Sequence, residues 1–154
     1  MERTNQRALP IVLLVVAALL VAARIASYGL APRSAMLVQW VPLEDAQQLA
    51  TSLGKPILYD FTADWCEPCH RLDDQVFRNA KLAGEINERF IPVQVVDRRQ
   101  EEGQNTPDVN ALQQRYGVRG FPTIVFATAE GSELARMEGF GGRDAFERVM
   151  ERAR

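Results

Sequence analysis

The amino-acid sequence predicts an α/β domain with a central mixed β-sheet flanked by helices, preceded by one N-terminal transmembrane helix. From residue 36 onward, short apolar or β-branched runs alternate with segments of helical periodicity. A Cys-X-X-Cys pair follows directly on one of these runs, and residues 8–23 are sixteen consecutive uncharged residues. We therefore assign residues 1–33 to a membrane anchor and linker and residues 34–154 to a single domain.

The uncharged N-terminal segment suits a signal anchor. Sixteen residues make about 24 Å of helix, which is short of a bilayer core of roughly 30 Å. We expect the helix to include residues 9–30, with the long side chain of Arg24 reaching to the interface. The alternative is a cleaved signal peptide, although no small-X-small site precedes Arg24. Both arrangements export residues 34–154 if the N-terminus stays in the cytoplasm. The positive charges on the two sides of the apolar segment barely discriminate between the two possible orientations.

The first half of the body predicts two strands and two helical segments. Residues 36–41 are rich in apolar side chains and suit a first strand, whereas residues 43–53 have helical spacing and end at a glycine. Residues 57–61 (ILYDF) form a short apolar run between turn signals, which is typical of a buried central strand. Residues 66–90 are mostly helical in pattern, with a break near Asn79.

The second half predicts three strands and two helices. Residues 91–96 (IPVQVV) are β-branched and start with the Ile-Pro pair tolerated at a strand entry. A helix over residues 109–116 is followed by a strand over 123–126, a glycine turn and a further strand over 134–137. The last helix covers residues 144–150. This order of elements implies a mixed sheet with helices on both faces.

Composition and charge exclude some classes of function. The chain has 18 Lys and Arg against 20 Asp and Glu, but residues 1–35 hold four Arg and one Glu, so the remainder carries 14 basic and 19 acidic residues. An acidic body without a basic stripe lacks the electrostatic term that dominates nucleic-acid binding, so we expect no nucleic-acid partner. Two cysteines are too few for a disulfide-stapled scaffold and point to a function of the pair.

Cys66 and Cys69 predict a redox pair. A strand-to-helix junction places Cys66 at a helix N-terminus, where free backbone N–H groups and the helix dipole favour a thiolate. Cys69 lies on the same helical face one turn deeper, within disulfide reach and shielded from solvent. Pro68 is tolerated there because the first-turn N–H has no helical partner. We therefore expect Cys66 to be the nucleophile and Cys69 the resolving thiol.

Other interpretations of the pair remain open. A zinc site would need carboxylates, because the chain has no further Cys and only one His, and no metal is expected. The Cys-X-X-Cys-His spacing that ends at His70 matches covalent haem attachment, but the motif follows a buried strand and no second His is available. A purely structural disulfide is disfavoured, since closing so short a loop removes little unfolded-state entropy.

The residues around the cysteines resemble the thioredoxin superfamily. The similarity rests on residues 58–69 (LYDFTADWCEPC) and 116–123 (YGVRGFPT) and covers roughly residues 40–150. The Ala-Asp-Trp-Cys approach and the closing Gly-Phe pair at 139–140 resemble the C-terminal thioredoxin domain of DsbD-like transmembrane thiol–disulfide interchange reductases. The Glu-Pro dipeptide between the cysteines is similar to membrane-anchored thioredoxins of cytochrome c maturation. The resemblance implies a thioredoxin-like domain, a disulfide reductase of the periplasmic type and no cofactor.

The resemblance also implies roles for neighbouring residues. Asp60 becomes the buried carboxylate beneath the disulfide, and burial in an apolar strand raises its pKa, so that it can exchange a proton with Cys69. The peptide bond before Pro122 is expected to be cis and to face the cysteines, with Phe121 offering backbone hydrogen bonds to an extended substrate. The residues expected to contact substrate are Trp65, Glu67, Pro68, Phe121 and Pro122.

The predicted function is that of a thiol–disulfide oxidoreductase, in the bacterial inner membrane as a single-pass protein with its domain in the periplasm, or exported if the anchor is cleaved. Asp60, Asp64 and Glu67 disfavour a thiolate nearby, which favours a reductase over an oxidase or isomerase. The expected partners are disulfide-bearing exported proteins and a transmembrane electron donor. A haem-binding c-type domain and a chaperone for thiol-bearing clients are the binding-protein alternatives. Residues 98–108 suit either a solvated loop or a partner contact.

Overall fold

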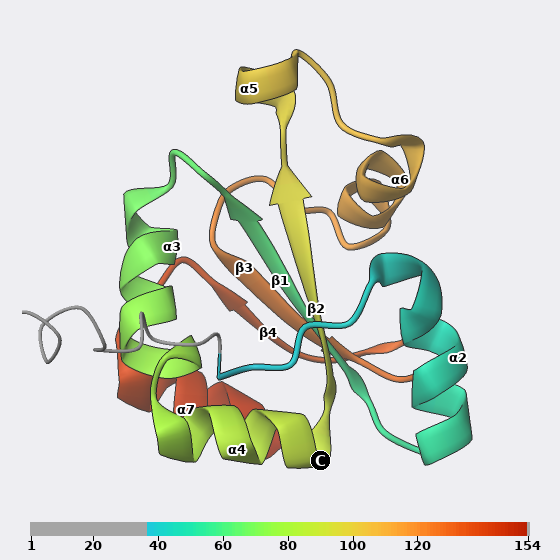
Figure 1. Ribbon diagram of the computed structural model, residues 1–154, viewed down its shortest axis with the longest axis vertical. Coiled ribbons are helices and arrows are strands. Elements are labelled where there is room, and N and C mark those ends of the chain that lie inside the picture. Colours follow the sequence, from blue (N-terminus) through green and yellow to red (C-terminus); the bar gives the residue numbers. More distant parts are fainter. Residues whose placement is uncertain (1–36, 154) are drawn as a thin grey trace, which may run out of the picture. The chain divides into compact units, whose positions relative to one another are not determined.

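The computed structural model describes residues 37–153 and contains one mixed four-stranded sheet in the order β2-β1-β3-β4 (Figure 1). The central strand β1 (Ile57–Ala63) pairs in parallel with β2 (Ile91–Asp97) and antiparallel with β3 (Thr123–Ala127). Strand β4 (Glu133–Glu138) pairs antiparallel with β3 and closes the other edge. The mixed sheet predicted from the sequence is therefore confirmed.

Helices cover both faces of this sheet (Figure 1). One face packs against α3, a π-helix, α4 and α7, and the other packs against α2 and α6. The bounds are α2 Leu43–Leu53, α3 Glu67–Leu72, the π-helix η1 Asp73–Phe77, α4 Ala80–Arg89, α5 Arg99–Glu102, α6 Pro107–Arg115 and α7 Arg143–Arg152.

The predicted helix ends follow from local chemistry. Helix α2 ends at Gly54, which adopts φ 61° and thereby supplies the left-handed turn that residues with a Cβ avoid. The predicted break near Asn79 is confirmed, because the Asn79 side chain accepts hydrogen bonds from the backbone N–H groups of Lys81 and Leu82 and starts α4. The chain from the first cysteine to Phe90 is thus one helical region in three pieces.

The predicted strand over residues 36–41 is wrong for the part that the structure describes. Residues 37–41 belong to no strand and bend at Val38, and one backbone hydrogen bond of 2.8 Å joins Val41 N–H to Pro92 O. The side chain of Asn87 binds two further backbone groups of this segment: it accepts from Gln39 N–H and donates to Leu37 O. A side-chain amide therefore replaces the strand ladder that the apolar pattern suggested.

The packing of the core explains why the carboxyl group of Asp60 is buried. Strand β3 is buried throughout and β1 at six of its seven positions, because helices lie on both faces. Phe126 on β3 contacts Phe90 and Phe146, with ring centroids 4.9 Å and 6.2 Å away. Within this apolar strand pair, Asp60 on β1 is 1% exposed.

The predicted anchor and linker, residues 1–33, lie outside the described residues. No helix within residues 37–153 is long and apolar enough to cross a membrane.

Candidate active site

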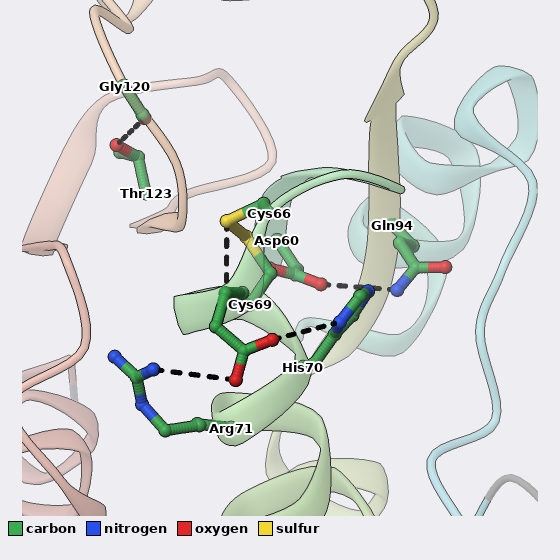
Figure 2. The surroundings of a disulfide bond; sticks show 9 residues. Asp60, Cys66, Cys69, His70, Arg71, Gln94, Gly120 and Thr123 are labelled. Atoms are coloured by element: carbon green, nitrogen blue, oxygen red, sulfur yellow. Dashed lines mark hydrogen bonds and ion pairs between the residues drawn. A yellow bond between two sulfur atoms is a disulfide. The ribbon is translucent and has the colours of Figure 1, made fainter. Parts of the chain in front are cut away.

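The two cysteines form a disulfide at the N-terminus of α3, with their Cα atoms 5.3 Å apart. Cys66 is the N-cap residue and has an extended backbone, so its Sγ accepts a hydrogen bond of 3.2 Å from the Cys69 backbone N–H (Figure 2). The same N–H would stabilise negative charge on Cys66 once the disulfide is reduced. The geometry thus marks Cys66 as the sulfur better suited to be a thiolate.

Solvent exposure does not distinguish the two sulfurs. The expected shielding of Cys69 is confirmed, but Cys66 is equally buried, and each residue is 2% exposed. The two cysteines and Ala63 form one buried cluster, and Phe121 packs against it. An attacking partner therefore reaches Cys66 only by close docking against the residues around it.

Asp60 lies under α3, as the resemblance implied. Side chains alternate along a strand, and Leu58 belongs to the core on the α3 face, so Asp60 faces that side as well. Its Oδ2 accepts a hydrogen bond of 3.3 Å from Gln94 Nε2 (Figure 2), whereas its Oδ1 has no hydrogen-bond partner within the described part of the chain. Burial raises the pKa of Asp60 to about 7; the Gln94 bond opposes this and the charge of Asp73 adds to it.

The loop at Phe121 supplies an open stretch of backbone beside the disulfide. The predicted cis peptide between Phe121 and Pro122 is confirmed. The flanking carbonyls are occupied, because Gly120 O accepts from Thr123 Oγ1 at 2.8 Å (Figure 2) and Pro122 O accepts from Gly139 N–H at 2.8 Å. Among residues 37–153, neither the N–H nor the C=O of Phe121 has a backbone partner. These two groups are therefore available to an extended segment.

The other residues that were predicted to contact substrate differ in how far they are exposed. Trp65 is 49% exposed and packs edge-on against Phe121, with centroids 5.9 Å apart, so the two rings form one apolar rim at the disulfide. Pro68 in α3 is partly buried, and Pro122 is buried. Glu67 is exposed on α3, where it pairs with His70 and Arg71.

The acidic residues near the thiols do not act as one group. Asp64 forms an ion pair and hydrogen bond with Arg98. Glu67 lies 3.8 Å from His70 and 3.7 Å from Arg71. Within the described residues, Asp60 is thus the carboxyl of the three that has no cationic partner, and the electrostatic argument for a reductase depends on Asp60 alone.

Sequence reasoning missed a buried polar network at the end of β2. Asp97 Oδ2 accepts from Asn105 Nδ2 at 2.7 Å and from Gln113 Nε2 at 2.9 Å, and its Oδ1 accepts from the Arg99 N–H at 3.1 Å. Burial alone would raise the pKa of Asp97, but these hydrogen bonds and the Arg99 charge outweigh it and lower the pKa. Residues 98–108, which by sequence suit a solvated loop or a partner contact, therefore contain α5 and the start of α6 and are bonded to the end of β2.

Gln94 was missed as well. The signal was present in the sequence only as a polar residue inside a β-branched run. Its significance depends on the register, in which Gln94 of β2 stands directly opposite Asp60 of β1.

A pair of sulfurs at a helix N-terminus, backed by a buried carboxyl and faced by an open backbone loop, defines a protein of thiol–disulfide exchange. Residues 43–154 match the family model of the thioredoxin-like domain, and the chain belongs to that family. The resemblance seen in the sequence is thereby confirmed.

Individual relatives agree with this assignment. Disulfide bond reductase DsbH of Chlamydia pneumoniae is 32% identical over 121 residues, covering 75% of this chain and 72% of that protein. Thiol:disulfide interchange protein DsbD of Ralstonia nicotianae is 29% identical over 112 residues, which are 72% of this chain but 17% of that protein. The chain thus corresponds to about a sixth of the DsbD relative.

Solved structures show the same similarity. A structure of DsbH oxidoreductase matches with a TM-score of 0.67 and 31% identity, over 79% of this chain and 88% of that one. The C-terminal domain of Neisseria meningitidis DsbD in its oxidised form matches with a TM-score of 0.52 and 28% identity, over 70% and 90% of the two chains. The protein is a thiol–disulfide oxidoreductase with a thioredoxin-like fold.

Proposed function

We propose that this protein reduces disulfide bonds of exported proteins, with Cys66 as the attacking sulfur and Cys69 as the resolving one. The observation that carries the proposal is the position of Asp60, a carboxyl with a pKa of about 7 buried under the helix that bears both sulfurs. The name of the DsbH relative, a disulfide bond reductase, supports the same direction of electron flow.

The first step uses the helix N-terminus. In the reduced protein, the Cys66 thiolate attacks one sulfur of the substrate disulfide, and the substrate S–S bond breaks as the new S–S bond forms. The departing substrate sulfur leaves as a thiolate and takes a proton from water. The hydrogen bond from the Cys69 N–H stabilises the Cys66 thiolate before the attack.

The second step uses the buried carboxyl. The Cys69 thiol transfers its proton to the Asp60 carboxylate, and the resulting thiolate attacks the Cys66 sulfur of the mixed disulfide. The second substrate sulfur leaves and is protonated, so the substrate gains two electrons and two protons while Cys66 and Cys69 become the disulfide seen here. Each turnover then requires a dithiol donor to reduce this pair again.

The charge of Asp60 supports the proposed direction of electron transfer. An ionised carboxylate under the pair disfavours a thiolate in the reduced form. A reduced form with little thiolate stabilisation has a lower reduction potential, which makes the pair a stronger reductant. With a pKa of about 7, Asp60 is partly ionised at neutral pH and contributes this effect there.

The proposed setting is the bacterial periplasm, with the N-terminal segment as a single membrane anchor. In an oxidising compartment a reductase depends on electrons carried across the membrane, so we propose a transmembrane dithiol donor of the thiol–disulfide interchange type as its partner. The apolar residues 8–23 support the anchor. Membrane fractionation and protease digestion of intact spheroplasts test this: protection of the domain from added protease would contradict the proposed location.

The reduction potential of the Cys66/Cys69 couple tests the function. The full-length chain, purified in mild detergent, is equilibrated with defined thiol buffers and the oxidised fraction is measured by thiol alkylation. We expect a value below about −220 mV, in the range of dithiols that need a dedicated donor. A value above about −150 mV would instead indicate an oxidase or isomerase.

Trapping assigns the two sulfurs. We expect Cys69→Ser to accumulate a mixed disulfide with a disulfide-bearing substrate, since the intermediate can no longer be resolved. The matched variant Cys66→Ser is expected to accumulate none. Accumulation in Cys66→Ser but not in Cys69→Ser would reverse the assigned roles.

A further inference from the structure

A cavity of about 220 Å³ lies beside Trp65 and Phe121, the two rings that form the apolar rim at the disulfide. Its walls include Trp65, Asp97, Arg99, Gln113, Arg119 and Phe121. Phe121 also packs against the cluster formed by Ala63, Cys66 and Cys69, so this aromatic side chain is shared by the cavity and the surroundings of the disulfide. A molecule that docks on the Phe121 backbone therefore has this cavity within reach.

The sheet brings the two sides of the cavity together. In the parallel register, Ala63 at the end of β1 stands opposite Asp97 at the end of β2. After β1 the chain continues to Trp65, and after β2 it continues into α5. Because the two strands are parallel, both segments leave the sheet at the same end of the strands (Figure 1). The ion pair between Asp64 and Arg98 joins the two segments directly.

The charge of the cavity is positive. The Asp97 side chain is 5% exposed. Its carboxylate accepts hydrogen bonds from Asn105 and Gln113 and forms an ion pair with Arg99. Arg99 Nε lies 3.1 Å from Asp97 Oδ2, yet 56% of its side chain remains exposed.

Arg119 adds the charge that is not balanced. It is exposed, and no ion pair or hydrogen bond to its side chain occurs among residues 37–153. The cavity thus carries two guanidinium groups against one buried carboxylate. This contrasts with the body as a whole, which has 19 acidic and 14 basic residues.

We propose that this cavity binds an acidic side chain of the substrate, an Asp or Glu close in sequence to the cysteine that Cys66 attacks. The proposal rests on the reductase function above and defines its substrate class. An extended segment paired with the Phe121 backbone projects alternate side chains to opposite sides, so residues flanking the substrate cysteine pass over the rim into the cavity. A planar guanidinium matches a carboxylate in geometry as well as in charge.

Matched peptides test the preference. Three disulfide-linked peptides differ only in the residues flanking each cysteine, which are Glu, Gln or Lys, and the pre-reduced full-length chain is mixed with each at low salt. The rate of peptide reduction is followed by mass spectrometry after acid quenching. We expect the Glu peptide to react about two- to fivefold faster than the Gln peptide, the size of a partly exposed ion pair, and the Lys peptide to be slowest.

Substitutions test whether Arg119 causes the faster reduction of the Glu peptide. We expect the ratio of Glu to Gln rates to fall to about one in Arg119→Gln and at high salt, and to be retained in Arg119→Lys, because the charge remains. Arg148→Gln, an exposed charge change on α7, is the matched control and should keep the wild-type ratio.

Two contrary results have different meanings. If all three peptides are reduced at equal rates, or the Lys peptide reacts fastest, the acidic-substrate proposal is overturned while the reductase function stands. If none is reduced by the reduced chain, the proposed function itself fails and the substrate preference fails with it.

Discussion

The Gln94 side chain donates a hydrogen bond of 3.3 Å to Asp60 from the position directly opposite it in the β1–β2 register. This is the one hydrogen bond that Asp60 receives on its carboxyl within the described residues, since Oδ1 has none. One neutral donor does not offset the loss of hydration on full burial, so the pKa of Asp60 stays near 7. A carboxyl with such a pKa can accept and return a proton at neutral pH.

Replacing Asp60 should change how stability depends on pH. The pKa of Asp60 is raised from 3.8 in the unfolded chain to about 7 in the folded one, so the folded state holds the proton more tightly. Its stability is therefore highest below pH 4, falls as the pH rises to 7, and is constant above. We expect Asp60→Asn to be more stable than the parent protein at pH 8 by up to about 4 kcal/mol, and to lose this advantage at pH 4.

Urea unfolding of the oxidised protein at pH 4, 6 and 8 measures this difference. Asp108→Asn, at an exposed position of α6, is the matched control and should show little pH dependence. An Asp60→Asn effect of equal size at all three pH values would show that Asp60 is already ionised throughout.

Removing the Gln94 donor should shift the pH profile of exchange. The hydrogen bond lowers the pKa of Asp60, so Gln94→Leu raises that pKa further. If Asp60 must be ionised to accept the Cys69 proton, the midpoint of the rate profile moves to higher pH in the variant. Single-turnover rates between pH 5 and 9 measure the midpoint, with the exposed Gln48→Leu as control. An unchanged midpoint would contradict the effect of Gln94 on the pKa of Asp60 during exchange.

Breaking the Asp97 network should destabilise the protein. Asn105→Ala removes one donor to Asp97 and the acceptor for the Arg98 N–H. We expect a loss of about 1–3 kcal/mol at pH 7. Because the pKa of Asp97 is lowered on folding, the part due to Asp97 is present above the unfolded pKa and disappears as the pH falls through the folded value.

Thermal unfolding at pH 7 and pH 3 measures both parts, and the exposed neighbour Gln104→Ala is the control. A loss that is larger at pH 3 than at pH 7 would contradict the assigned charge of Asp97.

Truncating the aromatic core should be costly on the α3 face of the sheet. Phe126 is fully buried between Phe90 and Phe146, so Phe126→Ala leaves a cavity as well as losing apolar burial. We expect a loss of about 3–5 kcal/mol in the free energy of unfolding. Leu53→Ala, at a residue 58% exposed, is expected to change it by less than about 0.5 kcal/mol. Urea titration measures both, and equal losses would contradict this packing.

Local patterns predicted most of the elements. The apolar run at Ile57, the helical spacing after Pro42 and the break near Asn79 each depend on neighbours in sequence, and each is confirmed. The prediction of a first strand was wrong because an apolar pattern indicates burial, and Val38 is buried in the core cluster without joining the sheet. A hydrophobic pattern in the sequence predicts that a residue is buried, but it does not predict which element packs against that residue.

By itself the sequence determined the thioredoxin-like class and the sulfur pair, since Cys66, Cys69 and the residues next to them lie within one continuous segment. The tertiary structure decided the contacts between residues that lie far apart in the sequence. Strand pairing placed Gln94 opposite Asp60, joined Asp64 to Arg98, and brought Arg99 and Arg119 to one cavity beside Phe121. Hydrogen bonds and charges act over a few ångströms, so their partners are known only once the register is set.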